Sequence, residues 1–105
     1  MKNNIALFID TSKIEEITVA LTIDGKRYEK ISQSRQMKAQ MVLPLIESLL
    51  KEHELKVQDI TEITVHEGPG SYTGLRVGMS VANTLAFLLG IPVNGHTPPL
   101  SPKYE

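Results

Sequence analysis

A glycine-rich turn, written GPGSYTG in the sequence, follows a short apolar run and precedes a helical pattern. Such a turn presents free backbone N–H groups at the positive end of a helix, an arrangement that binds phosphate. The hydroxyls of Ser71 and Thr73 are candidate further donors. The turn matches neither common nucleotide motif, because it lacks the Walker A lysine and because Gly68, Gly70 and Gly74 do not fit G-x-G-x-x-G. The alternative is a plain turn in which Ser71 caps the helix.

The first apolar run of the chain ends in a second group of polar residues, Asp10-Thr11-Ser12. This tripeptide is similar to one half of an aspartic-protease site, but the chain carries no second copy of it. Asp10 and Ser12, together with Ser71 and Thr73, form the set of four candidate phosphate-binding residues. The alternative for Asp10 and Ser12 is a local turn closed by their own side chains.

Other catalytic chemistry has little support in the sequence. Ser71 is not flanked by glycine two residues away on either side, so it does not form the G-x-S-x-G turn of hydrolases. His53, His66 and His96 are scattered, with no H-x-x-x-H pair for a metal ion. We therefore predict no catalytic residue and no metal site.

The helical pattern after the turn contains small residues at every fourth position. Residues four apart lie close together on a helix, so this spacing predicts a slowly winding groove along it. Glycine inside a helix costs about 1 kcal/mol relative to alanine, and close approach of another backbone is the usual compensation. The approaching backbone belongs either to the sheet of this chain or to a second chain. The small residues are Gly70, Gly74, Gly78, Ala82, Ala86 and Gly90.

Composition restricts the protein class. The chain has 105 residues, which suits one compact domain. Its formal net charge is −1, with basic and acidic residues interspersed, which argues against direct binding to nucleic acid. It has no cysteine, and no segment approaches the ~20 apolar residues of a membrane span. We expect a cytoplasmic protein that does not contact membranes.

Hydrophobic periodicity predicts the order β-β-β-α-β-α-β, an α/β domain with a mixed sheet and helices packed on it. Residues 5–9 read as a strand buried on both faces, and residues 16–23 and 26–34 as a hairpin around Asp24-Gly25. A helix is expected over 37–53, where Pro44 implies either a kink or a regular part that starts only a few residues earlier. The remaining elements are a strand at 62–66, a helix at 71–89 and a short edge strand at 91–93. Residues 1–95 form the expected domain, and residues 96–105 a Pro-rich tail.

Four segments together resemble the TsaB (YeaZ) family, the dimerisation subunits of the bacterial machinery that makes threonylcarbamoyladenosine in tRNA. They are IDTS at the end of the first strand, VLPLI in the first helix, GPGSYTGLRVG at the second helix and LGIPV after it. The resemblance covers about residues 4–95. It implies the first lobe of the actin/Hsp70/sugar-kinase fold, with a ribonuclease-H-like sheet.

The resemblance also implies a function. It indicates a non-catalytic scaffold that pairs with a TsaD-like catalytic subunit in a complex that modifies adenosine 37 of tRNA. A TsaE-like ATPase joins this complex, tRNA is bound only through it, and ATP and Mg²⁺ belong to the partner subunits, so no cofactor is expected here. A homodimer through similar surfaces is the other form of pairing. The alternative function is a small nucleotide- or phosphate-binding enzyme of the same superfamily.

We expect the partner to bind the small-residue groove and the first helix. The candidate interface residues are Met37, Met41, Leu45, Gly74, Val77, Gly78, Val81 and Ala82. Two departures from the family pattern stand out. Lys38 and Ala39 occupy positions where family members often have His-Ser, and catalytic relatives carry metal-binding histidines in that helix, so these residues favour a non-catalytic role. The family also continues into a second lobe, which normally completes the nucleotide cleft.

Overall fold

The computed structural model describes residues 4–33 and 38–95, and Met37 and residues 96–105 lie outside this range. Six of the seven expected elements are present in the predicted order, and a short 3₁₀ helix is added before the last strand. The elements are β1 (Ile5–Asp10), β2 (Glu16–Ile23), β3 (Lys26–Gln33), α1 (Lys38–Glu52), η1 (Val57–Asp59), β4 (Glu62–Val65) and α2 (Tyr72–Leu89).

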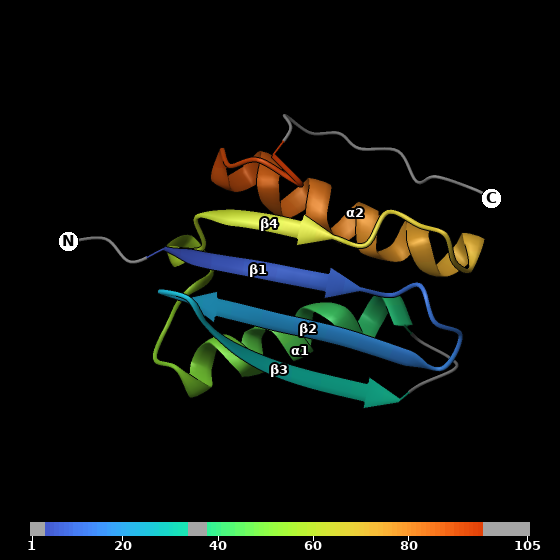
Figure 1. Cartoon of the computed structure of the whole chain (residues 1–105), viewed down its shortest axis with the longest axis horizontal. Helices are drawn as coiled ribbons and strands as arrows, with labels where there is room; N and C mark the ends of the chain where they lie inside the picture. Colours follow the sequence, from blue (N-terminus) through green and yellow to red (C-terminus); the bar gives the residue numbers. More distant parts are fainter. Residues whose placement is uncertain (1–3, 34–37, 96–105) are drawn as a thin grey trace.

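The four strands form one mixed sheet in the order β3-β2-β1-β4 (Figure 1). β1 pairs antiparallel with β2 and parallel with β4, while β2 pairs antiparallel with β3. The hairpin between β2 and β3 turns at Asp24 and Gly25, whose φ angles are 50° and 89°. Positive φ at both central residues is the turn geometry that matches strand twist, so this predicted hairpin is confirmed.

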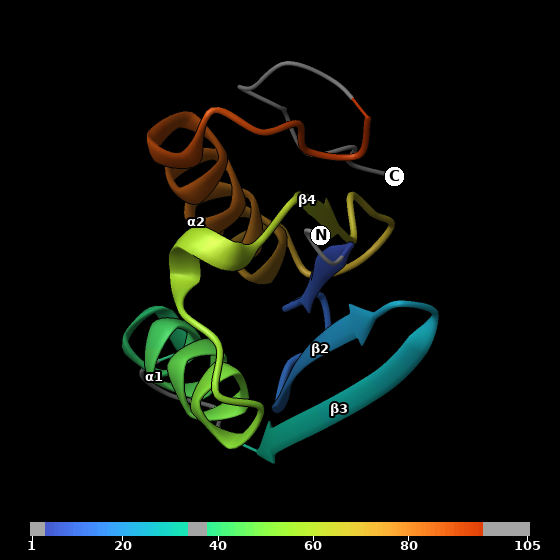
Figure 2. The same ribbon diagram turned by 90° about the vertical axis from the view of Figure 1, so that its left-hand side faces the viewer.

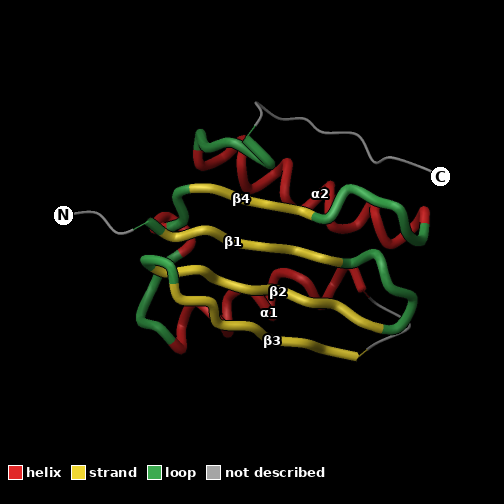
Figure 3. Tube along the Cα trace, viewed as in Figure 1, coloured by secondary structure: helices red, strands yellow, loops and turns green. Residues whose placement is uncertain are grey.

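Both helices pack on the same face of the sheet, as Figures 2 and 3 show from two directions. The prediction that β1 is buried on both faces is therefore wrong. Ile5, Leu7 and Ile9 are buried beneath the helices, whereas Phe8 and Asp10 on the other face are partly exposed. A five-residue apolar run looks the same in either environment, because small and aromatic residues also occur on half-covered sheet faces.

The core lies between the sheet and the two helices. Helix α1 contributes Val42, Ile46, Leu49 and Leu50, which recur at helical spacing on one face. The helix begins at Lys38 and continues through Pro44, and the Pro44 side chain is exposed. None of the helices in the described residues is long and apolar enough to cross a membrane.

The expected final strand is reduced to a single bridge, in which Val93 pairs in parallel with Ile63. The Ile63 amide donates to the carbonyl of Pro92, and the Asn94 amide donates to the carbonyl of Ile63. Pro92 has no N–H to donate, and Asn94 turns the chain away with a φ of 50°. The predicted strand at 91–93 is therefore wrong, although its residues do lie along the edge of β4.

Candidate functional site

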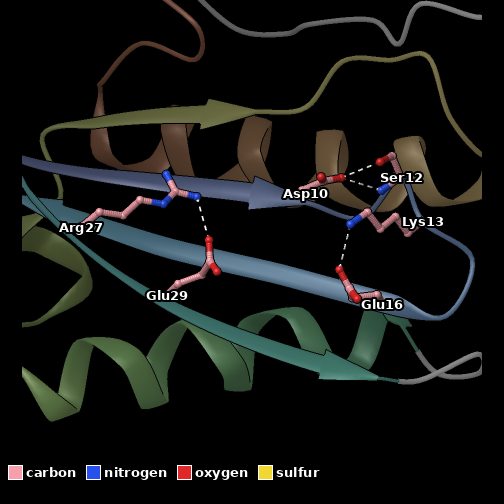
Figure 4. Close-up of polar contacts among 6 residues, drawn as sticks. All are labelled: Asp10, Ser12, Lys13, Glu16, Arg27 and Glu29. Atoms are coloured by element: carbon pink, nitrogen blue, oxygen red, sulfur yellow. Dashed lines mark hydrogen bonds and ion pairs between the residues drawn. The ribbon is translucent and has the colours of Figure 1, made fainter.

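The turn after β1 brings two of the predicted phosphate-binding residues together (Figure 4). The Asp10 carboxylate accepts hydrogen bonds from the Ser12 amide at 2.9 Å and from the Ser12 hydroxyl at 2.6 Å. This is the local turn that the sequence left as the alternative. Both bonds go to the same carboxylate oxygen, Asp10 Oδ1, which is thus engaged within the turn.

The glycine-rich turn lies against this first turn. The Ser71 amide donates to the carbonyl of Ser12 at 3.1 Å, and the Ser71 hydroxyl caps α2 by accepting from the Gly74 amide at 3.2 Å. A Cβ atom on Gly70 would lie 2.6 Å from the Cβ of Ser12, so only glycine permits this approach.

Three of the four phosphate-binding candidates therefore meet at one end of the sheet. Thr73 does not join them, because it is exposed on α2 and lines a second groove, described below, together with Ala39 of α1. Within the described residues, His, Asp and Glu side chains do not gather in groups of three that could hold a metal ion. The phosphate-binding hypothesis stays a prediction, in which the hydroxyls of Ser12 and Ser71 would have to exchange their present partners for a ligand.

The sheet face opposite the helices is mainly polar. Lys13 pairs with Glu16 at 3.1 Å, and Arg27 pairs with Glu29 at the same distance (Figure 4). The hydrogen bond to Glu16 raises the pKa of Lys13. The Arg27 guanidinium also lies 5.0 Å from the centre of the Phe8 ring, so the arginine covers the apolar side chain of Phe8. This face is therefore partly shielded by its own charged side chains.

The groove of small residues on α2 faces the sheet. Thr11, at the end of β1, is buried, and its hydroxyl donates to the Gly74 carbonyl at 2.5 Å while accepting from the Gly78 amide at 2.9 Å. In a regular α-helix, the Gly78 amide would donate to the Gly74 carbonyl four residues earlier. A Cβ atom on Gly78 would lie 2.6 Å from the Thr11 hydroxyl oxygen. The glycines thus let the end of β1 approach the helix backbone.

Three of the predicted interface residues face the interior of the lobe. Gly74 and Gly78 are buried against Thr11, and Ala82 is buried in the core, so their side of α2 faces the sheet. Their role in a partner interface stays a prediction. The backbone that approaches the glycines of α2 is the end of β1 in the same chain. This is one of the two alternatives that the spacing of the small residues allows, the other being a second chain. The sequence could not decide between them, because α2 is apolar on most of its circumference.

The other candidates lie in two separate places. The Glu52 carboxylate at the end of α1 pairs with Lys30 of β3. Met41 and Leu45 lie on the same side of α1 as Glu52, because the three residues follow helical spacing. Met41 and Leu45 therefore lie on the side of α1 nearest β3. Both are half-buried against the core. Val77 and Val81 line a groove on the outer side of the helical layer. We call this the α1–α2 groove, and its lining is Ala39, Thr73, Arg76, Val77, Ser80 and Val81.

The α1–α2 groove has a volume of about 550 Å³ and combines an apolar floor with a polar rim. Val77 and Val81 are half-buried, whereas Ala39, Thr73 and Ser80 are exposed. Apolar side chains continue onto the same layer beyond the groove, since Leu43 is 45% exposed, Phe87 80% and Leu88 72%. Contiguous exposed apolar side chains mark surfaces that bind other proteins, and Leu88 follows Val77 and Val81 at helical spacing along α2.

Comparisons with known proteins agree on one family. The family model described as TsaD, tRNA N6-adenosine threonylcarbamoyltransferase, matches residues 30–95. The tRNA threonylcarbamoyladenosine biosynthesis proteins TsaB of Bacillus subtilis and Escherichia coli are 38% and 33% identical to this chain over 88 and 89 residues. The solved structure of YeaZ from Pseudomonas aeruginosa superimposes with a TM-score of 0.80 at 33% identity. The chain belongs to the TsaB (YeaZ) family.

The match to TsaB proteins covers most of this chain but a smaller part of theirs. It includes 84% of this chain and 38% of the B. subtilis TsaB, and 86% of this chain and 42% of the P. aeruginosa YeaZ. The chain thus spans about two fifths of the length of these relatives. Its mixed sheet with two helices on one face is the ribonuclease-H-like first lobe of the TsaB fold, as predicted.

Some residues of the site in this TsaB-family chain were not identified from the sequence. The sequence indicates only a turn at Thr11, because nothing in its neighbours reveals that its side chain contacts Gly74 of α2, 63 residues later. Ala39, Arg76 and Ser80 line the same groove as Val77 and Val81, but they are not among the interface residues that the sequence predicts. The sequence signal for Arg76 and Ser80 is their position on α2, since Thr73, Arg76, Val77 and Ser80 lie on the side of that helix opposite the small residues.

Proposed function

We propose that this chain is a non-catalytic scaffold of the machinery that makes N6-threonylcarbamoyladenosine at position 37 of tRNA. Its TsaB relatives carry threonylcarbamoyladenosine biosynthesis in their names, and the matching family model describes the transferase that completes this modification. Because the chain spans only about two fifths of its relatives, the proposal concerns the part that the first lobe plays. That part is association with a TsaD-like catalytic subunit.

The α1–α2 groove is the observation that carries this proposal. Protein interfaces combine an apolar centre with a polar rim, and the half-buried Val77 and Val81 sit within a rim of Thr73, Arg76 and Ser80. The exposed Phe87 and Leu88 extend the apolar surface along the same helix. A TsaD-like partner is the occupant that the family relationship favours, with a second copy of the chain as the competing occupant. A TsaE-like ATPase would join the pair once it has formed.

A non-catalytic role fits the polar groups at the end of the sheet. The Asp10 carboxylate, the Ser12 hydroxyl and the Ser71 hydroxyl each make a local hydrogen bond that shapes a turn or caps a helix. These bonds account for the three side chains without a substrate. The chain's formal charge of −1 likewise favours tRNA contact through partner subunits.

Substituting a groove residue tests this proposal. Ser80 is exposed on the rim, so Ser80→Glu adds charge and volume to the groove without entering the core. We expect it to weaken binding to the TsaD-like protein of the same organism by at least about tenfold in calorimetry. Ile31→Glu is the matched control, because Ile31 is also exposed but lies on β3, away from the groove. Equal binding by the folded Ser80→Glu chain would place the partner elsewhere.

A further inference from the structure

The side chain of Asn94 behaves as an additional peptide group at the edge of β4. Its carbonyl oxygen accepts from the Val65 amide at 2.8 Å, and its amide nitrogen donates to the Val65 carbonyl at 2.9 Å. The same nitrogen donates to the Glu67 carboxylate at 2.5 Å. The Asn94 side chain therefore continues the pairing that Val93 begins with Ile63, and it links this last described segment to the glycine-rich turn.

Asn94 is followed by Gly95, and this dipeptide is chemically labile. Asparagine is among the thermolabile residues, and a following glycine leaves its backbone nitrogen sterically open. That nitrogen can attack the side-chain carbonyl carbon of Asn94 to form a cyclic imide. The new N–C bond replaces the bond to the side-chain amide, which leaves as ammonia. Water then opens the ring to aspartate or isoaspartate, so the net change takes in one water and releases one ammonia.

The hydrogen bonds of Asn94 oppose this reaction in the folded chain. Ring closure requires the side-chain carbonyl carbon to turn toward the Gly95 nitrogen. Both ends of the side-chain amide are held by Val65, and its nitrogen is also held by Glu67. The ring can form only after the segment around Asn94 has opened locally, and such opening has its own free-energy cost.

We propose that Asn94-Gly95 is a deamidation site that the fold keeps inert and that becomes a one-way switch once the segment opens. A carboxylate at residue 94 has no hydrogen to donate to the Val65 carbonyl, and it would lie beside the Glu67 carboxylate. Like charges at hydrogen-bond distance repel each other, so the segment cannot close again in the same way. Release of the segment would leave the backbone groups of Ile63 and Val65 as an unpaired sheet edge.

The test compares deamidation of the intact chain with and without urea at neutral pH, followed by peptide mapping of residue 94. We expect the native rate at Asn94 to be at least about tenfold lower than the denatured rate, because native opening is rare. Glu67→Ala should raise the native rate by about tenfold, since it removes one charge-assisted hydrogen bond. Glu62→Ala is the matched control, because Glu62 is exposed on β4 and should leave the rate unchanged.

The consequence of the reaction has a separate readout. Asn94→Asp should speed hydrogen exchange at the Val65 amide while leaving exchange in the centre of β1 unchanged, because only the β4 edge loses its partner. Equal deamidation rates in native and denatured chains would overturn the proposal. So would slow reaction in the denatured chain, or unchanged exchange at Val65 in the Asn94→Asp chain.

Discussion

The hydroxyl of Thr11 accepts a hydrogen bond from the amide of Gly78 at 2.9 Å, where a Cβ atom on residue 78 would lie only 2.6 Å from it. The same hydroxyl donates to the Gly74 carbonyl, so a single buried side chain joins the end of β1 to two backbone groups of α2. The glycines of the GPGSYTGLRVG segment therefore serve packing within the lobe. The surface that we propose for the partner lies on the other side of the same helix.

Gly78→Ala should destabilise the chain. Helix propensity favours alanine by about 1 kcal/mol, but the new methyl group would meet Thr11 and lie 3.3 Å from the Val65 side chain. Since Thr11 is tied to Gly74 and cannot withdraw freely, we expect a net loss of roughly 1–2 kcal/mol in urea unfolding. Ser80→Ala, exposed on the same helix, is the control and should not lower stability. A Gly78→Ala chain as stable as the wild type would contradict the packing role of this glycine.

Large residues at positions 74 and 78 should unfold the lobe. Leucine at either position would have to enter the space between α2 and the sheet, because Gly74 and Gly78 are both buried. Loss of partner binding in such variants would reflect unfolding, so they are unsuitable probes of the interface.

Thr11→Val should cost about 1–3 kcal/mol in unfolding free energy, because it keeps the shape of the side chain but removes its hydroxyl from a buried site. Thr11→Ser keeps the hydroxyl and loses a methyl group, so we expect it to be the more stable of the two variants. The comparison requires only urea titrations of both chains. A valine variant more stable than the serine variant would show that the hydrogen bonds to Gly74 and Gly78 contribute little.

Titration with ATP and Mg²⁺ should give no saturable heat. The Asp10 carboxylate and the Ser12 and Ser71 hydroxyls are engaged in local hydrogen bonds, and Thr73 lies apart from them. Asp10→Ala should instead lower stability by roughly 1 kcal/mol through loss of the turn. Micromolar binding that Asp10→Ala abolishes would favour the alternative of a nucleotide-binding enzyme.

Local signals predicted most of the fold because they act over a few residues. Asp24-Gly25 sets the hairpin and hence its register, in which Ile23 pairs with Lys26. Ser71 and Gly90 bound α2 as an N-cap and a left-handed C-cap. These features depend only on neighbouring residues, and they appear in the structure close to where the sequence placed them.

The features that the sequence did not predict depend on contacts between distant segments. Whether Gly78 faces the sheet or a partner depends on Thr11, which lies 67 residues earlier. Residues 91–93 have the residue types of a strand, but only Val93 pairs with β4. Pairing ends there because the side chain of Asn94, in place of its backbone, bonds to Val65. The partly exposed face of β1 likewise depends on where the two helices pack, which no property of residues 5–9 specifies.

The mass of the chain mixed with the TsaD-like protein of its own organism tests the scaffold role most directly. Light scattering after size-exclusion chromatography measures this mass for each protein alone and for the mixture. We predict a discrete complex of the two proteins, because the α1–α2 groove presents Val77 and Val81 within a polar rim. Two separate species, or a homodimer that does not respond to the TsaD-like protein, would contradict it.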